Sequence, residues 1–306
     1  MTRALRPHSS TCHAAGRACR LSLLTLIAGV SASCANVPTA DVHTAPASSA
    51  ATTTTATPSA ATLNPDQLSP EHIQLLQSTM AHLLPLITAK KQDGAANILT
   101  WDDLYQPLPP EERAFLDAFR ALKAEALGST SHYYGEAPGP GELVPVGAEE
   151  VTKDGAPQTL DPQFLPKTVH DAYQAMMEVM QADLGKRLYV ESGYRSPAYQ
   201  LYLFLYYMPK HGHSIRETNR YVALPGYSEH GYPPHQAIDF INQDDTSGED
   251  HPEEFEGLPE YQWLTEHAPW FGFHLSYPRG NASNTAFEPW HWHYEAPPED
   301  NGEANR

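Results

Sequence analysis

Cysteine is almost absent from this chain. The three cysteines, Cys12, Cys19 and Cys34, all lie within the first 34 of 306 residues. The remaining part of the chain therefore has no disulfide and no thiolate ligand for a metal. Any metal site in that part must use histidine and carboxylate side chains.

Positive charge is also scarce. Lysine and arginine together number 19 against 37 acidic residues, which gives a net charge of −18. Such a charge opposes binding to nucleic acid and to anionic lipid headgroups. We therefore expect no nucleic-acid partner and no binding to the cell wall through a basic patch.

The chain lacks an apolar run long enough to span a membrane. Its N-terminal run, Leu21 to Val30, has about ten residues and follows four arginines. A basic start, a short apolar stretch and small residues are typical of a secretory signal, predicted over residues 1–33. Its removal takes away four positive charges and changes the net charge from −18 to −22.

The end of this signal resembles a bacterial lipoprotein cleavage site, Ser31-Ala32-Ser33-Cys34. We therefore expect an exported, periplasmic lipoprotein whose membrane attachment is a lipid on Cys34. The alternative is an ordinary signal peptide that contains Cys34 and is cleaved at a site such as Ala35.

Composition and hydrophobic periodicity divide the chain after residue 33 into four segments. Residues 34–65 are rich in Ala, Thr, Ser and Pro and indicate a disordered tether. Residues 66–160 indicate a helical accessory region followed by a long surface connection over 132–165. Residues 161–297 indicate a folded domain, and residues 298–306 an acidic tail.

Capping residues and apolar spacing predict the elements. Helices should begin after Ser69, Pro109, Ser196 and Leu258, and another should cover Val169 to Leu184; the expected stops are Gly128 and Gly185. Strands are predicted over residues 188–190, 236–241 and 286–294. The fold class is therefore α+β, with a small antiparallel sheet that carries a metal site, flanking helices and an N-terminal helical extension.

Three segments near the C-terminus carry the residues of a mononuclear zinc hydrolase. They are SGYRSPAYQ (192–200), PGYSEHGYPPHQAIDF (225–240) and EPWHWHY (288–294). A catalytic zinc needs three protein ligands, an open position and a carboxylate that accepts the proton of the attacking water. His230, Asp239 and His291 can supply the ligands for one Zn²⁺ per chain, and Glu288 the base.

The surroundings of these residues favour functional roles. Asp239 lies inside the apolar run 237–241, where burial of a carboxylate is costly unless it is paired or bound to metal. Arg195 follows a predicted strand, and its planar fork suits a carboxylate or a carbonyl oxygen that gains charge. His291 and His293 face the same way on an extended strand, so either could reach a metal.

In order, spacing and context, the segments resemble the VanY-like D-alanyl-D-alanine carboxypeptidases, zinc D,D-peptidases of the LAS type. That family shows an SGYRS-type segment with a downstream Gln, then SxHxxGxAxD, then ExxWH. Here the first motif is 192–196 with Gln200, and the third is 288–291. The resemblance covers roughly residues 160–295. It implies that His291 is the ligand, and that Gln200, Ser228 and His293 contact substrate; His293 stands where the family commonly has arginine.

The middle motif departs from the family pattern. Asp239 follows His230 by nine residues instead of seven, with the insertion at 232–234, and His235 stands where the motif glycine would align. We assign His230 as the ligand because the Pro-Gly-x-Ser-x-His frame around it is intact. His235 is the alternative ligand.

The resemblance implies a zinc-dependent D,D-carboxypeptidase that hydrolyses D-alanyl amide bonds in peptidoglycan stem peptides. An endopeptidase for the L-alanyl-D-glutamate bond is the alternative enzyme. A catalytically inactive wall-binding module is the alternative from another class, suggested by the insertion before Asp239.

Overall fold

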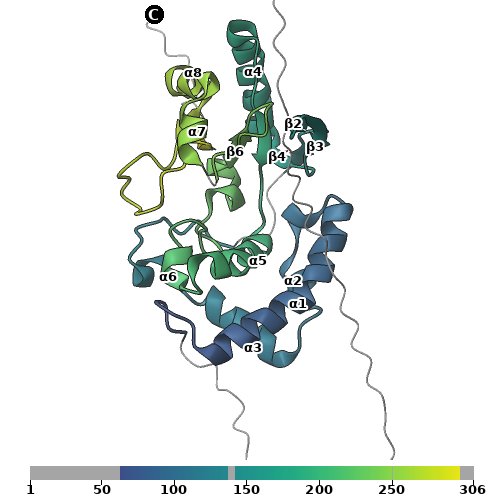
Figure 1. Cartoon of the computed structure of the whole chain (residues 1–306), viewed down its shortest axis with the longest axis vertical. Helices are drawn as coiled ribbons and strands as arrows, with labels where there is room; N and C mark the ends of the chain where they lie inside the picture. The colour runs from purple at the N-terminus through teal and green to yellow at the C-terminus, as the bar shows by residue number, and fades with distance from the viewer. Residues whose placement is uncertain (1–62, 137–141, 250, 297–306) are drawn as a thin grey trace, which may run out of the picture. The chain divides into compact units, whose positions relative to one another are not determined.

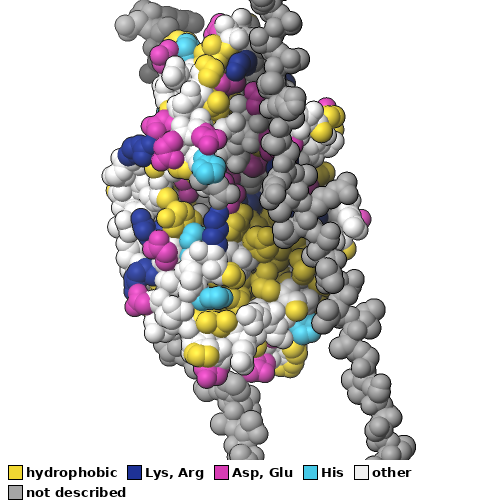
Figure 2. All heavy atoms as spheres, viewed as in Figure 1, with side chains coloured by type: hydrophobic (Ala, Val, Ile, Leu, Met, Phe, Trp, Pro, Cys, Tyr) yellow, Lys and Arg dark blue, Asp and Glu magenta, His cyan; other side chains and the backbone are white. Residues whose placement is uncertain are grey.

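The computed structural model describes residues 63–136, 142–249 and 251–296 (Figure 1). The predicted signal peptide, Cys34, most of the predicted tether and the acidic tail lie outside the described residues. Within the described part, no helix is both long and apolar enough to cross a membrane. Acidic side chains are scattered over the face shown in Figure 2 and do not gather in a single patch.

The N-terminal helices pack against a helix from the second half of the chain. They are α1 (Pro70–Gln92), α2 (Trp101–Tyr105) and α3 (Pro110–Arg120), and they surround α5 (Pro197–Tyr207). Leu83, Phe119 and Phe204 are fully buried in the core that these helices share. The predicted accessory region therefore completes the core on which α5 rests.

Local capping explains where these helices begin. The Ser69 side chain accepts a hydrogen bond from the backbone N–H of His72, and Ser196 caps α5 in the same way. Both predicted starts are confirmed. The second predicted helix is shorter than expected, because α3 ends at Arg120 and Gly128 instead ends the 3₁₀ turn η2 (Ala124–Leu127) with a φ of 83°.

The predicted irregular connection over 132–165 is wrong in part. It contains β1 (Leu143–Pro145), which pairs with β4 (Phe164–Pro166), and a hairpin of β2 (Glu150–Lys153) and β3 (Ala156–Thr159). Only Val151 and Leu165 are buried among these strand residues. Strands this short, with so few buried side chains, leave no periodic signal in the sequence.

The central sheet has four antiparallel strands in the order β5-β6-β8-β7. These are β5 (Tyr189–Ser192), β6 (Ala237–Ile241), β7 (Phe273–Leu275) and β8 (His291–Tyr294). The predicted α+β class, with a small antiparallel sheet and flanking helices, is confirmed.

Helices cover one face of this sheet. The second core contains Met176 and Met180 of α4 (Lys167–Leu184) and Leu264 of α8 (Pro259–His267), packed with Phe240 and Trp292 of the sheet. Figure 1 shows α4 and α8 side by side. Since side chains alternate along a strand, Asp239, His291 and His293 point to the opposite face.

The last predicted strand begins later than expected. Residues 286–288 are irregular and 289–290 form a turn, which the N–H of His291 closes by donating to the carbonyl of Glu288. The indole N–H of Trp292 donates to the carbonyl of Pro289 and holds the turn against the strand. Two short helices that the pattern did not predict, α6 (Ile215–Thr218) and α7 (Pro252–Glu256), lie in the connections.

Gly193 joins β5 to the segment before α5 at a point where the backbone of β4 approaches closely. A Cβ atom there would lie 2.5 Å from the carbonyl oxygen of Phe164. Gly193→Ala should therefore lower the free energy of unfolding by about 1–3 kcal/mol, because the crowded backbone must shift. Thermal and denaturant unfolding measure this change.

Gly257→Ala is the matched control. Gly257 has a φ of −77°, and an added Cβ would meet ordinary contacts at 3.4 Å and beyond. Its substitution should change stability by no more than about 0.5 kcal/mol. Equal stability of the two variants would contradict the steric account of Gly193.

Candidate metal centre

Strand pairing brings two of the predicted ligands together. Asp239 of β6 lies directly opposite His291 of β8 in the register of the sheet. His230 approaches from the 3₁₀ turn η4 (Glu229–Gly231), whose His230 carbonyl accepts a hydrogen bond from the N–H of Arg195. The three predicted ligand side chains therefore meet at one point, where they form one of two possible metal-binding groups among the described residues.

Hydrogen bonds select the nitrogen that each histidine presents. His230 Nδ1–H donates to the carbonyl oxygen of Gly193 at 2.7 Å, which leaves the lone pair of Nε2 facing the centre. Likewise, His291 Nε2–H donates to Glu229 Oε2 at 2.9 Å, so Nδ1 faces the centre. These partners fix the ring orientation and the tautomer that a metal requires.

The separations of the donor atoms suit a small tetrahedral ion. His230 Nε2 lies 3.1 Å from Asp239 Oδ2 and 3.3 Å from His291 Nδ1, which itself lies 2.8 Å from Asp239 Oδ1. Ligand atoms bound about 2.0–2.1 Å from a tetrahedral zinc are about 3.3 Å apart. The donor types fit Zn²⁺, and the separation of the two histidine nitrogens matches this spacing.

Electrostatics at the centre favour a cation. Burial, helped by the charge of Arg195, lowers the pKa of His230 to about 4, so its ring is neutral at pH 7. Burial also disfavours the charged form of His291, but Asp239 and Glu229 outweigh it and raise the pKa of His291 to about 10. The same negative field that holds this proton would stabilise a metal ion in its place.

Glu288 is a buried carboxyl beside the ligands. Its side chain is 11% exposed, and Oε2 lies 3.7 Å from His291 Nδ1. Burial, together with Asp239 and Glu229, raises the pKa of Glu288 to about 8, against the opposing effect of His291 and Arg195. A carboxyl with a pKa near the working pH can both accept and return a proton.

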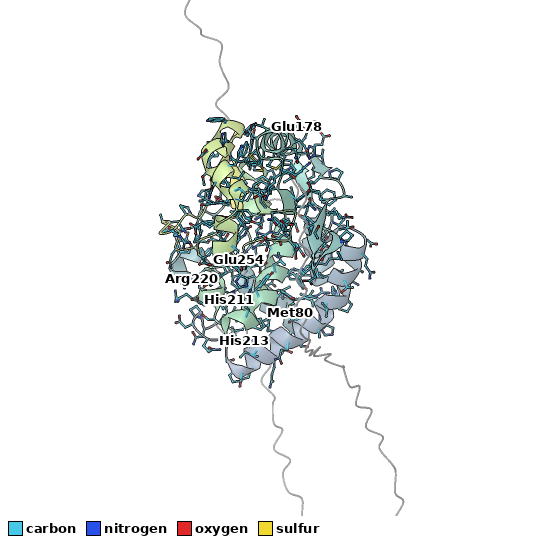
Figure 3. All side chains as sticks on the ribbon, turned by 45° about the horizontal axis from the view of Figure 1, so that its top comes forward. Met80, Glu178, His211, His213, Arg220 and Glu254 are labelled. Atoms are coloured by element: carbon cyan, nitrogen blue, oxygen red, sulfur yellow. The ribbon has the colours of Figure 1, made fainter. Side chains whose placement is uncertain are left out.

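The predicted substrate-contact residues lie mostly in one cleft of about 800 Å³. Arg195, Gln200 and Ser228 line it together with Asp239, Glu288 and His291. Gln200 Nε2 donates to the carbonyl of Ala223, while Gln200 Oε1 has no hydrogen-bond partner among the described residues. The cleft extends to His211, labelled in Figure 3, whose ring stacks on Tyr221.

Two histidines of the motifs lie elsewhere. His293 does not line the cleft; its Nδ1 lies 2.8 Å from Ser276 Oγ. The ring of His235 stacks on that of His293, and both lie beside Glu229 in the second of the two possible metal-binding groups. The structure therefore separates His235, the alternative ligand, from Asp239 and His291.

Glu229 is a residue that the sequence reasoning did not single out. It is buried, and hydrogen bonds from His235 and His291 outweigh the effect of burial and hold the pKa of Glu229 well below its usual range. Its carboxylate orients His291, as the partners of metal-bound histidines commonly do. The one sequence feature that could have pointed to Glu229 is its position between Ser228 and His230. Its contact with His291, 62 residues later in the chain, leaves no local pattern in the sequence.

Comparisons with known proteins identify the region that carries this centre. Residues 162–297, less than half of the chain, match the family model described as VanY: D-alanyl-D-alanine carboxypeptidase. The chain is also 28% identical over 139 residues to the putative carboxypeptidase YodJ of Bacillus subtilis (strain 168). That match covers 45% of this chain and 48% of YodJ, so the chain spans about half the length of this curated relative.

Solved structures give further similarities. The LdcB LD-carboxypeptidase is 23% identical with a TM-score of 0.41, over 56% of this chain and 77% of that chain. The vancomycin resistance D,D-pentapeptidase VanY in complex with Zn(II) is 23% identical with a TM-score of 0.35, over 48% of this chain and 78% of that chain. The family match over residues 162–297 confirms the resemblance that the three motifs indicate.

The two histidines of the middle motif can be separated by metal binding. We expect the wild type to bind one zinc tightly and His230→Ala to lose it, because this change removes one of three converging donors. His235→Ala should keep it, since its ring belongs to the other group. Metal analysis after dialysis against equimolar zinc measures both. Tight binding that survives in His230→Ala and disappears in His235→Ala would reverse the assignment.

Proposed function

Residues 162–297 belong to the VanY family of D-alanyl-D-alanine carboxypeptidases, and on this basis we propose that the protein is a zinc-dependent peptidase of peptidoglycan stem peptides. The reaction proposed is that of a D,D-carboxypeptidase, the hydrolysis of a terminal D-alanyl amide bond. The observation that carries the proposal is the convergence of His230, Asp239 and His291 beside the buried Glu288. Three such ligands and a carboxylate base are the residues that hydrolytic zinc sites use.

The protein groups have distinct roles in this reaction. A zinc ion held by the three ligands would polarise the scissile carbonyl and lower the pKa of the attacking water. Glu288 accepts a proton from that water and delivers it to the departing amine. The raised pKa of Glu288 makes its carboxylate a stronger base toward the proton of the water.

The cleft supplies the contacts with the peptide. The side chain of Arg195 is 20% exposed, and one guanidinium nitrogen lies 4.0 Å from Asp239 Oδ2, close to the ligands. From there Arg195 can stabilise the carbonyl oxygen that gains charge. Gln200 Oε1 is a buried acceptor without a partner among the described residues, which suits an N–H group of the substrate.

Product analysis distinguishes the related activities. Mass spectrometry of muropeptides should show pentapeptide stems that lose one D-alanine. Loss of the D-alanine from tetrapeptide stems would instead indicate an L,D-carboxypeptidase. Cleavage between L-alanine and D-glutamate, which releases the rest of the stem peptide, would indicate the endopeptidase. Muropeptides left uncut by the zinc-loaded protein would favour a wall-binding module.

We further propose that the reaction takes place outside the cytoplasm, because residues 1–33 have the composition of a secretory signal. A lipid on Cys34 would hold the domain at the membrane through the segment 34–65. Peptidoglycan is then within reach of the tethered domain.

Glu288→Gln tests the assignment of the base. The amide keeps the shape of the side chain but cannot accept a proton, so kcat should fall by about 100- to 10,000-fold while zinc remains bound. Glu178→Gln, an exposed change on α4 (labelled in Figure 3), is the control and should leave kcat unchanged. Turnover near that of wild type in zinc-loaded Glu288→Gln protein would rule out this role.

Arg195→Lys tests the role of the guanidinium group. If Arg195 stabilises the carbonyl oxygen, kcat should fall while KM changes little, and Arg195→Ala should lower kcat by about 100- to 1,000-fold. If it instead binds the terminal carboxylate, KM should rise for peptides that end in free D-alanine. Steady-state kinetics separate the two, and wild-type constants in both variants would remove Arg195 from the active site.

A further inference from the structure

One wall of the substrate cleft carries a carboxylate that the proposed reaction does not use. Glu191 lies on β5 next to Val190, whose side chain is buried in the core beneath the helices. Since side chains alternate along a strand, Glu191 points to the opposite face of the sheet, which is also the face of Asp239. It lines the cleft together with the residues of the metal centre.

Negative charge surrounds Glu191. Burial, together with the charges of Asp239 and Glu249, raises the pKa of Glu191 to about 8, although a hydrogen bond from the hydroxyl of Ser247 opposes this shift. Glu249 lines the same cleft. A positive group placed beside Glu191 would therefore be attracted by several carboxylates at once.

The basic side chains of the cleft are engaged elsewhere. Four of them line it, and each lies beside a carboxylate other than Glu191: Arg195 beside Asp239, Lys210 beside Glu249, Lys91 beside Asp161 and Arg279 beside Glu256. Within the described part of the chain, Glu191 thus forms no ion pair. A ligand in the cleft would have to supply the positive charge.

The turn next to Glu191 is held against the metal centre. Gly248 has a φ of 105°, and a Cβ atom there would lie 2.5 Å from the ring of Trp290, the residue that directly precedes the ligand His291. Ser247 and Glu249, on either side of this glycine, therefore have little freedom to move away from the centre. Glu191 and its neighbours form a built part of the cleft.

The proposed substrate carries a positive charge within reach of this wall. The third residue of a peptidoglycan stem peptide is a diamino acid, such as lysine or meso-diaminopimelate, and it directly precedes the two D-alanines. Two residues of extended chain span about 7 Å. With the D-alanyl bond at the metal centre, the amine-bearing side chain can thus reach the neighbouring wall.

We propose that Glu191 is a specificity-determining residue that binds the free amino group of the diamino acid in the stem peptide. The inference rests on the proposed function and names the substrate class that the same cleft takes. A hydrogen bond between an ammonium group and a carboxylate is charge-assisted, and it is strong where water has little access.

Peptide binding tests this role. Zinc-loaded Glu288→Gln protein is titrated by calorimetry with two pentapeptides that end in D-Ala-D-Ala. One has lysine as its third residue, and the other has Nε-acetyl-lysine, which lacks the charge. The lysine peptide should bind about 10-fold more tightly. A further Glu191→Gln substitution should remove this difference by weakening only the lysine peptide.

A third pentapeptide, with meso-diaminopimelate, identifies the diamino acid. Loss of affinity for both amine-bearing peptides in Glu191→Gln supports the proposal, and the peptide that binds more tightly before this substitution is the one that the wall fits. Glu254→Gln, an exposed change on α7 (labelled in Figure 3), removes the same charge outside the cleft and should keep the preference for the free amine.

The readout separates this proposal from the peptidase function. Zinc content and binding of the acetylated peptide report an intact site in Glu191→Gln. Peptides that wild type binds but does not cut would refute the peptidase function, while the dissociation constants still decide the role of Glu191. Equal affinity for the lysine and acetyl-lysine peptides, a difference that survives Glu191→Gln, or no binding of any peptide would overturn it.

Discussion

The antiparallel pairing of β6 with β8 is the constraint on which the site depends. It sets Asp239 opposite His291, where cross-strand side chains lie close enough to share one ion. The same register turns Ile238 and Trp292 toward the helices. A slip of one residue would bury the polar side chains in the core and expose the apolar ones, so burial of one face fixes the geometry of the other.

The polar face of the central sheet lies beside several buried carboxylates, and burial of these charges would be costly without partners. Asp239, Glu229 and Glu288 are all buried, and each lies near a histidine of the motifs or Arg195. Electrostatic attraction to His230 and His291, together with the hydrogen bond from His291, holds the pKa of Asp239 well below its usual range despite its burial. Glu288 lacks such hydrogen bonds among the described residues, and its raised pKa follows from that difference.

The N-terminal helices contribute to the site although none of the proposed catalytic residues lies on them. Ser196 Oγ–H donates to the carbonyl of Leu99, and the N–H of Ser196 donates to that of Asn97. Asn97 also donates to Gln163 Oε1, which accepts the N–H of Gly193. These bonds hold the segment around Arg195 on both sides, so the helical layer positions the guanidinium group in the cleft.

The sequence alone determined the features that depend on a few neighbouring residues: the helix starts after Ser69 and Ser196, the stop at Gly185, the apolar strand around Asp239 and the family resemblance of roughly residues 160–295. The tertiary structure decided which histidines share a centre. His230 joins His291 across 61 residues, and His235 joins His293 instead, because the strand register and the turns η4 and η5 set those distances. Local sequence signals reach only a few residues along the chain, whereas such long-range contacts exist only once the two cores have packed.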